Sequence, residues 1–90
     1  MQYRQNPGIA WREIEGEAVL VDSKAARLLV LNPAGLALWR LLEADQTEES
    51  LAKALGEQFS VGAERAIEDV RSFLGTLAER NLIESVHSNP

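Results

Sequence analysis

The stretch of residues 27–42 most constrains what this chain can fold into, because it joins a strand pattern directly to a helix start. Residues 27–31 are rich in leucine with one β-branched residue, which is typical of a short strand with apolar side chains on both faces. Asn32 then supplies a favoured N-cap, and Pro33 suits the first helical turn. The helix that follows carries a single charge, Arg40, which predicts that it is buried on most sides. The other elements must therefore pack around this strand and helix.

Two more strand patterns precede this unit. Residues 9–14 and 17–22 flank Glu15-Gly16, and two short runs around a turn that contains glycine predict a β-hairpin. The composition of residues 22–25 favours a second turn, so a third strand is expected at residues 26–31. Together these patterns predict an antiparallel three-stranded meander with its third strand at the edge.

Two amphipathic helices are expected after the buried one. Thr47 is a good N-cap, and apolar residues then recur at a spacing of four from Leu51 to Phe59. A second apolar stripe over residues 63–78 predicts the longest helix. Asn81 favours the left-handed conformation that ends helices. The predicted fold class is α+β, a three-stranded antiparallel β-meander followed by three α-helices.

The length of 90 residues suits one domain with a thin core. We expect residues 9–84 to form this domain, residues 1–8 to be a flexible lead-in and residues 85–90 to be a disordered tail. The amino terminus lacks the apolar run of an export signal, and no apolar stretch approaches the ~20 residues of a membrane span. These features predict a cytoplasmic protein without a membrane partner.

The residue types that catalysis needs are almost absent. The chain has no cysteine, and its one histidine, His87, lies in a polar segment. We find no Gly-rich phosphate loop, nucleophile elbow or metal-ligand spacing. The adjacent acids Glu68 and Asp69 diverge on a helix, so they form no paired-carboxylate site. The sequence therefore predicts a protein that is not an enzyme and that binds neither a cofactor nor a metal.

The third strand is the best candidate for a binding surface. Leu28 and Val30 point to one of its faces and Leu29 to the other, so both faces need cover. An apolar edge strand is either shielded, here by the carboxyl-terminal helix, or open to pairing with another chain. Phe73 equally has two interpretations, the rim of the core or the wall of a groove. Trp39 is expected in the core.

The order of motifs along the chain resembles the PqqD-like family. This family comprises relatives of coenzyme PQQ synthesis protein D, also called recognition elements of ribosomally synthesised, post-translationally modified peptides (RiPPs). The resemblance covers residues 9–83 and rests on Trp11, AVLV at 18–21, LNPAGLALW at 31–39, Leu51, Leu55 and Phe59, and EDVRSFLGTLAERNLI at 68–83. It implies a winged-helix-like domain that binds the leader part of a precursor peptide and delivers it to a separate modifying enzyme.

The same resemblance implies where the leader binds. It would add as a strand antiparallel to the third strand and lie in a groove against the third helix. The strand residues of this implied site are Ala26, Arg27, Leu28, Leu29, Val30 and Leu31. The helical wall is formed by Ala66, Asp69, Val70, Phe73 and Leu77.

The LNPAG form at residues 31–35 is more similar to the B1 proteins of lasso peptide clusters than to members of the PQQ pathway. A lasso-type member would work with a leader peptidase, whereas a PQQ-type member would present its precursor to a radical SAM enzyme. We favour the lasso type. Asn81 stands where family members often have glycine, but asparagine can adopt the same left-handed conformation.

Two functions of other classes stay open. A winged helix can bind DNA, but the net charge of −5 and the mixed charges of the longest helix argue against a nucleic-acid partner. Alternatively, two copies could pair their third strands, which would make the protein a weak homodimer in place of a monomer. A leader peptide would compete with such pairing, because both would use the same edge.

Overall fold

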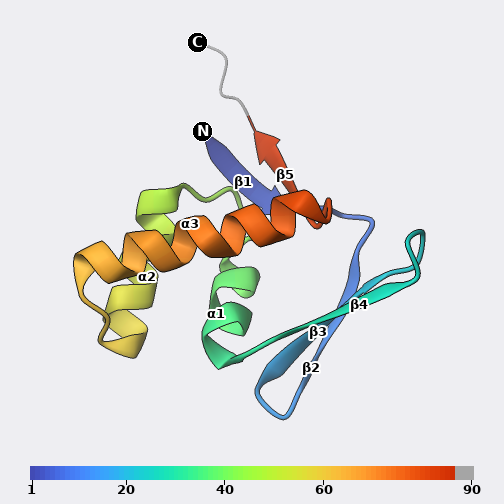
Figure 1. Cartoon of the computed structure of the whole chain (residues 1–90), viewed down its shortest axis with the longest axis horizontal. Coiled ribbons are helices and arrows are strands. Elements are labelled where there is room, and N and C mark those ends of the chain that lie inside the picture. The colour runs from blue at the N-terminus through green and yellow to red at the C-terminus, as the bar shows by residue number, and fades with distance from the viewer. Residues whose placement is uncertain (87–90) are drawn as a thin grey trace.

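Eight elements follow one another along residues 1–86, the part of the chain that this computed structural model describes (Figure 1). They are β1 (Gln2–Gln5), β2 (Ala10–Ile14), β3 (Glu17–Asp22), β4 (Arg27–Leu31), α1 (Pro33–Leu41), α2 (Glu48–Phe59), α3 (Ala63–Glu79) and β5 (Ile83–Val86). The predicted α+β fold is confirmed, because a three-stranded antiparallel sheet is followed by three helices.

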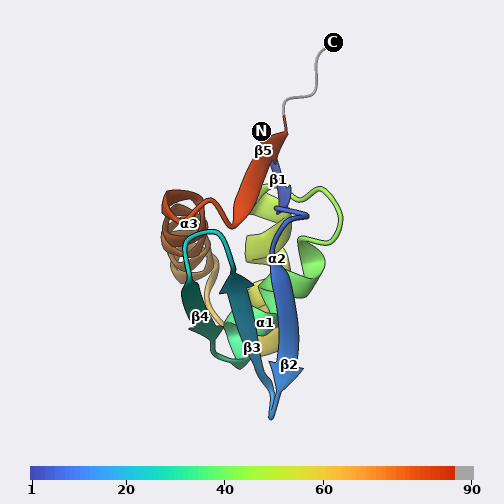
Figure 2. The same cartoon turned by 90° about the vertical axis from the view of Figure 1, so that its right-hand side faces the viewer.

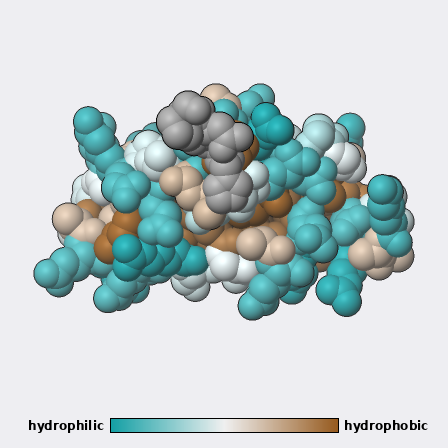
Figure 3. All heavy atoms as spheres, turned by 90° about the horizontal axis from the view of Figure 1, so that it is seen from above, coloured by the Kyte–Doolittle hydropathy of each residue, from teal (hydrophilic) through white to brown (hydrophobic). Residues whose placement is uncertain are grey.

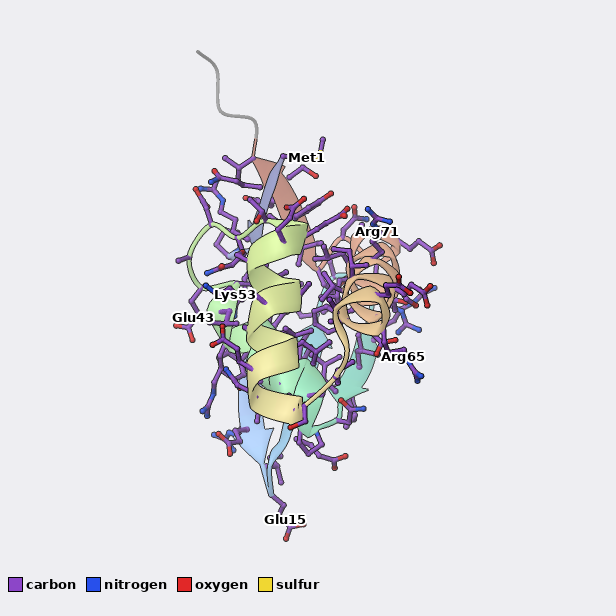
Figure 4. The ribbon with its side chains drawn as sticks, turned by 90° about the vertical axis from the view of Figure 1, so that its left-hand side faces the viewer. Met1, Glu15, Glu43, Lys53, Arg65 and Arg71 are labelled. Carbon is purple, nitrogen blue, oxygen red and sulfur yellow. The ribbon has the colours of Figure 1, made fainter. Side chains whose placement is uncertain are left out.

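The main sheet has the strand order β2-β3-β4, and both pairs are antiparallel. The β2–β3 hairpin turns at Glu15 and Gly16, whose φ angles are both positive at 51° and 82°. Two successive left-handed residues suit the right-handed twist of the strands. Glu15 lies at the tip of this hairpin (Figure 4). The predicted meander is therefore confirmed, and β4 is its third strand.

β1 and β5 form a separate antiparallel ribbon, in which Gln5 lies opposite Ile83. The amide of Tyr3 donates a hydrogen bond to the Gln46 carbonyl at 2.7 Å, and Gln5 Nε2 donates one to the Trp39 carbonyl at 2.7 Å. The expected flexible lead-in is therefore wrong for residues 2–5. The expected tail is wrong for residues 85 and 86, which belong to β5, and its residues 87–90 lie outside the described residues.

The helix boundaries follow their capping residues. Asn32 Oδ1 accepts a hydrogen bond from the Gly35 amide at 2.8 Å at the start of α1. Thr47 caps α2 in the same way, through the Ser50 amide at 3.0 Å. Beyond α3, Asn81 has the predicted left-handed conformation, with a φ of 57°. These local signals mark the starts of α1 and α2 and the end of α3, whereas Gly62 before α3 makes no side-chain cap hydrogen bond.

The core lies between the inner face of the main sheet and the helices, with α1 against β3 (Figures 1 and 2). Trp39 is fully buried, as predicted, and the partly buried Trp11 meets it edge to face with ring centroids 6.3 Å apart. Seen from above, hydrophobic surface forms only a narrow strip between hydrophilic side chains (Figure 3). Residues of the three helices supply most of the buried core.

An ion pair joins α3 to α2 at the surface. Arg71 Nε donates a hydrogen bond to Glu48 Oε2 at 2.9 Å, and Arg71 projects from α3 in Figure 4. This hydrogen bond and the negative charge of Glu48 raise the pKa of Arg71. Exposed pairs of this kind add little to stability, so the position of α3 is set by its buried face.

Candidate functional site

β4 has a free edge. It pairs with β3 on one side, and within residues 1–86 no strand pairs with its other side. Its outward backbone N–H and C=O groups are therefore available to another strand. α3 lies on the same side of the molecule as this edge (Figure 2).

The side chains of β4 alternate as expected, but only one face is covered. Leu31 is buried and Leu29 is partly buried against the core. Leu28 and Val30 face outward and are 64% and 55% exposed, so the second apolar face has no cover. Ala26, which was expected in the strand, precedes it and has a φ of 55°. Such a left-handed residue belongs to the turn before β4 and does not continue the pleat.

α3 contributes two kinds of residue to this region. Ala66, Val70 and Leu77, which the family resemblance places in the helical wall, are at most 1% exposed. Their side chains lie in the core and hold the helix, so they offer no surface to a ligand. Asp69 is exposed and Phe73 is partly buried, and both face a hollow. The residues that the resemblance placed in one helical wall thus form two groups, one buried in the core and one accessible from the hollow.

The hollow beside Phe73 lies between α3 and the start of α1 and has a volume of about 310 Å³. Its lining comprises Asn32, Ala34, Gly35, Leu38, Leu55, Asp69, Ser72 and Phe73. Only Asp69 and Phe73 had been assigned to the site from the sequence. The LNPAG segment could have indicated Asn32 and Gly35, because it places the helix start directly after the edge strand.

A second, smaller hollow lies at the opposite end of β4. Its apolar residues are Leu20, Leu28, Leu29 and Leu82, and its charged residues are Asp22, Arg27 and Arg80. Arg80 follows α3 and was not assigned to the site from the sequence. The two hollows thus lie beside opposite ends of β4, one against α3 and the other against the residues that follow α3. We call these two hollows, together with the β4 edge between them, the β4–α3 groove.

A larger hollow of about 520 Å³ lies elsewhere, between α2 and the beginning of α3. Its apolar lining includes Ala52, Val61 and Ile67, and Lys53, labelled on α2 in Figure 4, also lines it. It adjoins neither a free strand edge nor an aromatic ring. We therefore assign the candidate site to the β4–α3 groove in spite of its smaller volume.

The described residues contain no cluster of three or more His, Cys, Asp or Glu side chains that could hold a metal ion. In the same part of the chain, none of the helices has both the length and the apolar composition that crossing a membrane requires. The accessible groups of the groove therefore include backbone amides and carbonyls, apolar side chains, the carboxylates of Asp22 and Asp69 and two guanidinium groups. These groups suit recognition of an extended peptide.

Comparison with known families decides the affiliation. Residues 17–83, which include β3, β4 and all three helices, match the model of coenzyme PQQ synthesis protein D (PqqD). The chain belongs to the PqqD family. No curated protein sequence matches it.

Three solved structures share the fold of this PqqD-family chain. TbiB1 in complex with the TbiA(beta) leader peptide is 26% identical with a TM-score of 0.83, over 94% of this chain and 99% of that one. A lasso peptide synthetase B1 complexed with the leader peptide is 19% identical with a TM-score of 0.82, over 94% and 100% of the chains. The PqqD truncation of Methylobacterium extorquens PqqCD, a RiPP recognition element, is 22% identical with a TM-score of 0.76, over 93% and 89%.

Gly35 shows why a glycine suits this point of the PqqD-family chain. A Cβ atom there would lie 3.0 Å from Leu31 Cβ and 3.6 Å from Phe73 Cε1. α1 therefore approaches the end of β4 more closely than a larger residue permits, and this approach forms one wall of the groove.

We expect Gly35→Ala to lower the free energy of unfolding by about 1–3 kcal/mol, because overpacking displaces its neighbours. Urea titrations followed by circular dichroism measure this loss. Gly75→Ala is a matched control within α3, since a Cβ atom at Gly75 would meet no heavy atom within 4 Å. Alanine there should be neutral or stabilising. Equal stability of both variants would show that Gly35 is not tightly packed.

Proposed function

We propose that this protein binds the leader segment of a ribosomally synthesised precursor peptide and presents the precursor to a separate modifying enzyme. The observation that carries the proposal is the free edge of β4 beside the accessible ring of Phe73. The similarity to TbiB1, which was solved with a leader peptide, supports it. The protein acts in this proposal as a recognition module without a catalytic step of its own.

The leader adds to the sheet as a strand antiparallel to β4. Its backbone hydrogen bonds supply sequence-independent affinity, and alternate side chains supply specificity. One set of side chains enters the β4–α3 groove towards Phe73. The other set lies beside Leu28 and Val30 on the outer face, where exposed apolar surface is already present. The preferred leader is therefore apolar on both faces of its docking strand.

The residues proposed to contact the leader are fewer than the family resemblance implied. On β4 they are Arg27, Leu28, Leu29, Val30 and Leu31, and on α3 they are Asp69 and Phe73. Asn32 and Gly35 join them at the helix start. Ala26 contributes through the turn that begins the strand, and Ala66, Val70 and Leu77 contribute by holding α3 in place.

Delivery of the precursor works through effective concentration. A leader held on β4 keeps its attached substrate segment near any enzyme that binds this protein, so a weak enzyme–substrate contact becomes sufficient. We propose a lasso-type pathway with a leader peptidase as the partner enzyme. The LNPAG segment and the nearly complete coverage of TbiB1 support this choice over a radical SAM partner of the PQQ type.

A nuclear magnetic resonance titration tests the function. Isotope-labelled protein is mixed with synthetic leader peptides from precursor genes encoded beside this one. We expect saturable amide shifts confined to β4, the start of α1 and the Asp69–Arg80 side of α3. Absence of shifts with every neighbouring leader, or shifts confined to the hollow between α2 and α3, would overturn the proposal.

Pairing of two copies through β4 is the second candidate, since Leu28 and Val30 are exposed beside the free edge. Sedimentation of the free protein distinguishes the two functions. A dimer that dissociates when leader peptide is added would show that both use the edge. A dimer that no leader affects would favour self-pairing alone.

A further inference from the structure

The β4–α3 groove carries opposite charges at its two ends. Asp69 lines the hollow at the α1 end, together with Phe73. Arg27, Arg80 and one carboxylate, Asp22, line the hollow at the other end, around Leu29. The groove is thus acidic where β4 ends and basic where β4 begins.

The spacing of these charges matches one short strand. β4 and α3 run in opposite directions along the groove (Figure 1). The helical rise of about 1.5 Å per residue separates Asp69 from Arg80 by roughly 16 Å. Five residues of an extended strand span about the same length. A peptide strand docked on β4 therefore reaches both charged ends at once.

The charges at the basic end are available to a ligand. Within residues 1–86, neither Arg27 nor Arg80 forms an ion pair. Asp22 lines the same hollow, but its Oδ1 accepts hydrogen bonds from the amides of Lys24 and Ala25 at 3.1 and 3.2 Å, which ties this carboxylate to its own turn. Lys24 adds a further positive charge to this turn. The two arginines at this end therefore outweigh the single negative charge of Asp22, and the net charge of the hollow is positive.

The acidic end is less isolated. Asp69 Oδ1 lies 3.4 Å from Arg65 Nε on the preceding turn of α3, and the two side chains are 48% and 74% exposed. Figure 4 shows Arg65 projecting from α3. A contact between such exposed side chains is weak and exchanges readily with a ligand cation. Asp69 can therefore accept a basic side chain of the peptide.

We propose that the groove selects leader peptides by the order of their charges, with a basic side chain in the first part of the docking strand and an acidic one in the last part. This inference rests on the proposed function. Antiparallel addition places the amino-terminal end of the peptide beside Leu31 and Asp69, and its carboxyl-terminal end beside Arg27 and Arg80. The substrate segment that follows the leader consequently leaves the groove at the Arg80 end, near the β3–β4 turn.

Two synthetic peptides of identical composition test the proposal. Both carry apolar residues at alternate positions, but one has lysine first and glutamate last, and the other has the reverse order. Fluorescence anisotropy measures their Kd values with the full chain. Each exposed ion pair contributes roughly two- to fivefold in affinity at low ionic strength. We expect the lysine-first peptide to bind several-fold tighter, and the difference to shrink at about 1 M salt.

Charge variants locate the effect. Arg80→Glu should remove most of the preference for the lysine-first peptide, and Asp69→Lys should do the same from the other end of the groove. Arg12→Glu is the matched control, because Arg12 is an exposed arginine on β2, the opposite edge strand. Arg12→Glu changes the net charge by the same amount as Arg80→Glu, and it should keep the preference for the lysine-first peptide. Circular dichroism verifies that each variant is folded.

The possible outcomes distinguish charge selection from the proposed leader binding on which it rests. Equal binding of both peptides, with amide shifts on β4, would overturn charge selection and leave leader binding intact. Tighter binding of the glutamate-first peptide would overturn it as well, because the strand would then run parallel to β4. If neither the synthetic peptides nor the neighbouring leaders shift the β4 amides, both the function and the inference are wrong.

Discussion

Phe73→Ala should weaken binding of a leader peptide by roughly thirtyfold, which corresponds to about 2 kcal/mol. Phe73 is the aromatic side chain of the hollow beside the free strand edge, and its ring approaches the space above Gly35. Aromatic anchors in desolvated pockets commonly dominate the binding energy of an interface. Calorimetric titration of the wild type and the variant with the same leader peptide measures the loss.

Phe59→Ala is the matched control for this measurement. Phe59 ends α2, is 40% exposed and lines neither hollow of the β4–α3 groove. It should bind leader as the wild type does. Leu29→Asp offers an independent test from the strand side, because it places a charge in the groove. If Phe73→Ala and Leu29→Asp remain folded and bind normally, the groove is not the leader site.

Trp39→Ala should lower the free energy of unfolding by about 3–5 kcal/mol, a loss typical of deleting a large buried aromatic side chain. Trp39 is fully buried, and its ring packs against Trp11. Single domains have total stabilities of about 5–15 kcal/mol, so this variant should be close to unfolding at ambient temperature. Urea unfolding followed by far-ultraviolet circular dichroism measures the change.

Trp39→Phe separates the packing of this ring from its polar atom. Within residues 1–86, Trp39 Nε1 is buried and has no hydrogen-bond partner. Phenylalanine removes this unsatisfied donor, whose burial costs about 1–3 kcal/mol, and thereby offsets part of the lost contact. We therefore expect Trp39→Phe to be much more stable than Trp39→Ala. Equal losses in both variants would contradict this account.

Local signals in the sequence were sufficient for most of the elements. A capping side chain, a proline in the first turn and a left-handed asparagine each act within a few residues. Asn32, Pro33 and Thr47 accordingly predicted where α1 and α2 begin, and Asn81 predicted where α3 ends. The Glu15-Gly16 turn likewise predicted the first hairpin. Such features depend on covalent geometry and short-range hydrogen bonds, and these are the same in any fold.

Features that depend on distant partners were missed. β1 has the polar sequence QYRQ, and its order comes from β5, Gln46 and the Trp39 carbonyl, all remote along the chain. The family resemblance placed both buried and accessible residues of α3 in one helical wall, and periodicity could not separate them, because it shows which residues share a face but not how far the core extends across it. Arg80 gave no signal, since only the direction of α3 brings it to the start of β4.

The sequence by itself thus determined the fold class, the order of the elements from β2 to α3 and the identity of β4 as an edge strand, because these follow from periodicity, caps and turns. The tertiary structure alone decided which side chains are free to bind. It buried Ala66, Val70 and Leu77, left Phe73 accessible beside Gly35, and placed Asp69 and Arg80 at opposite ends of one groove. The physical reason is that burial and charge placement depend on how separate elements pack, which no short stretch of the chain encodes.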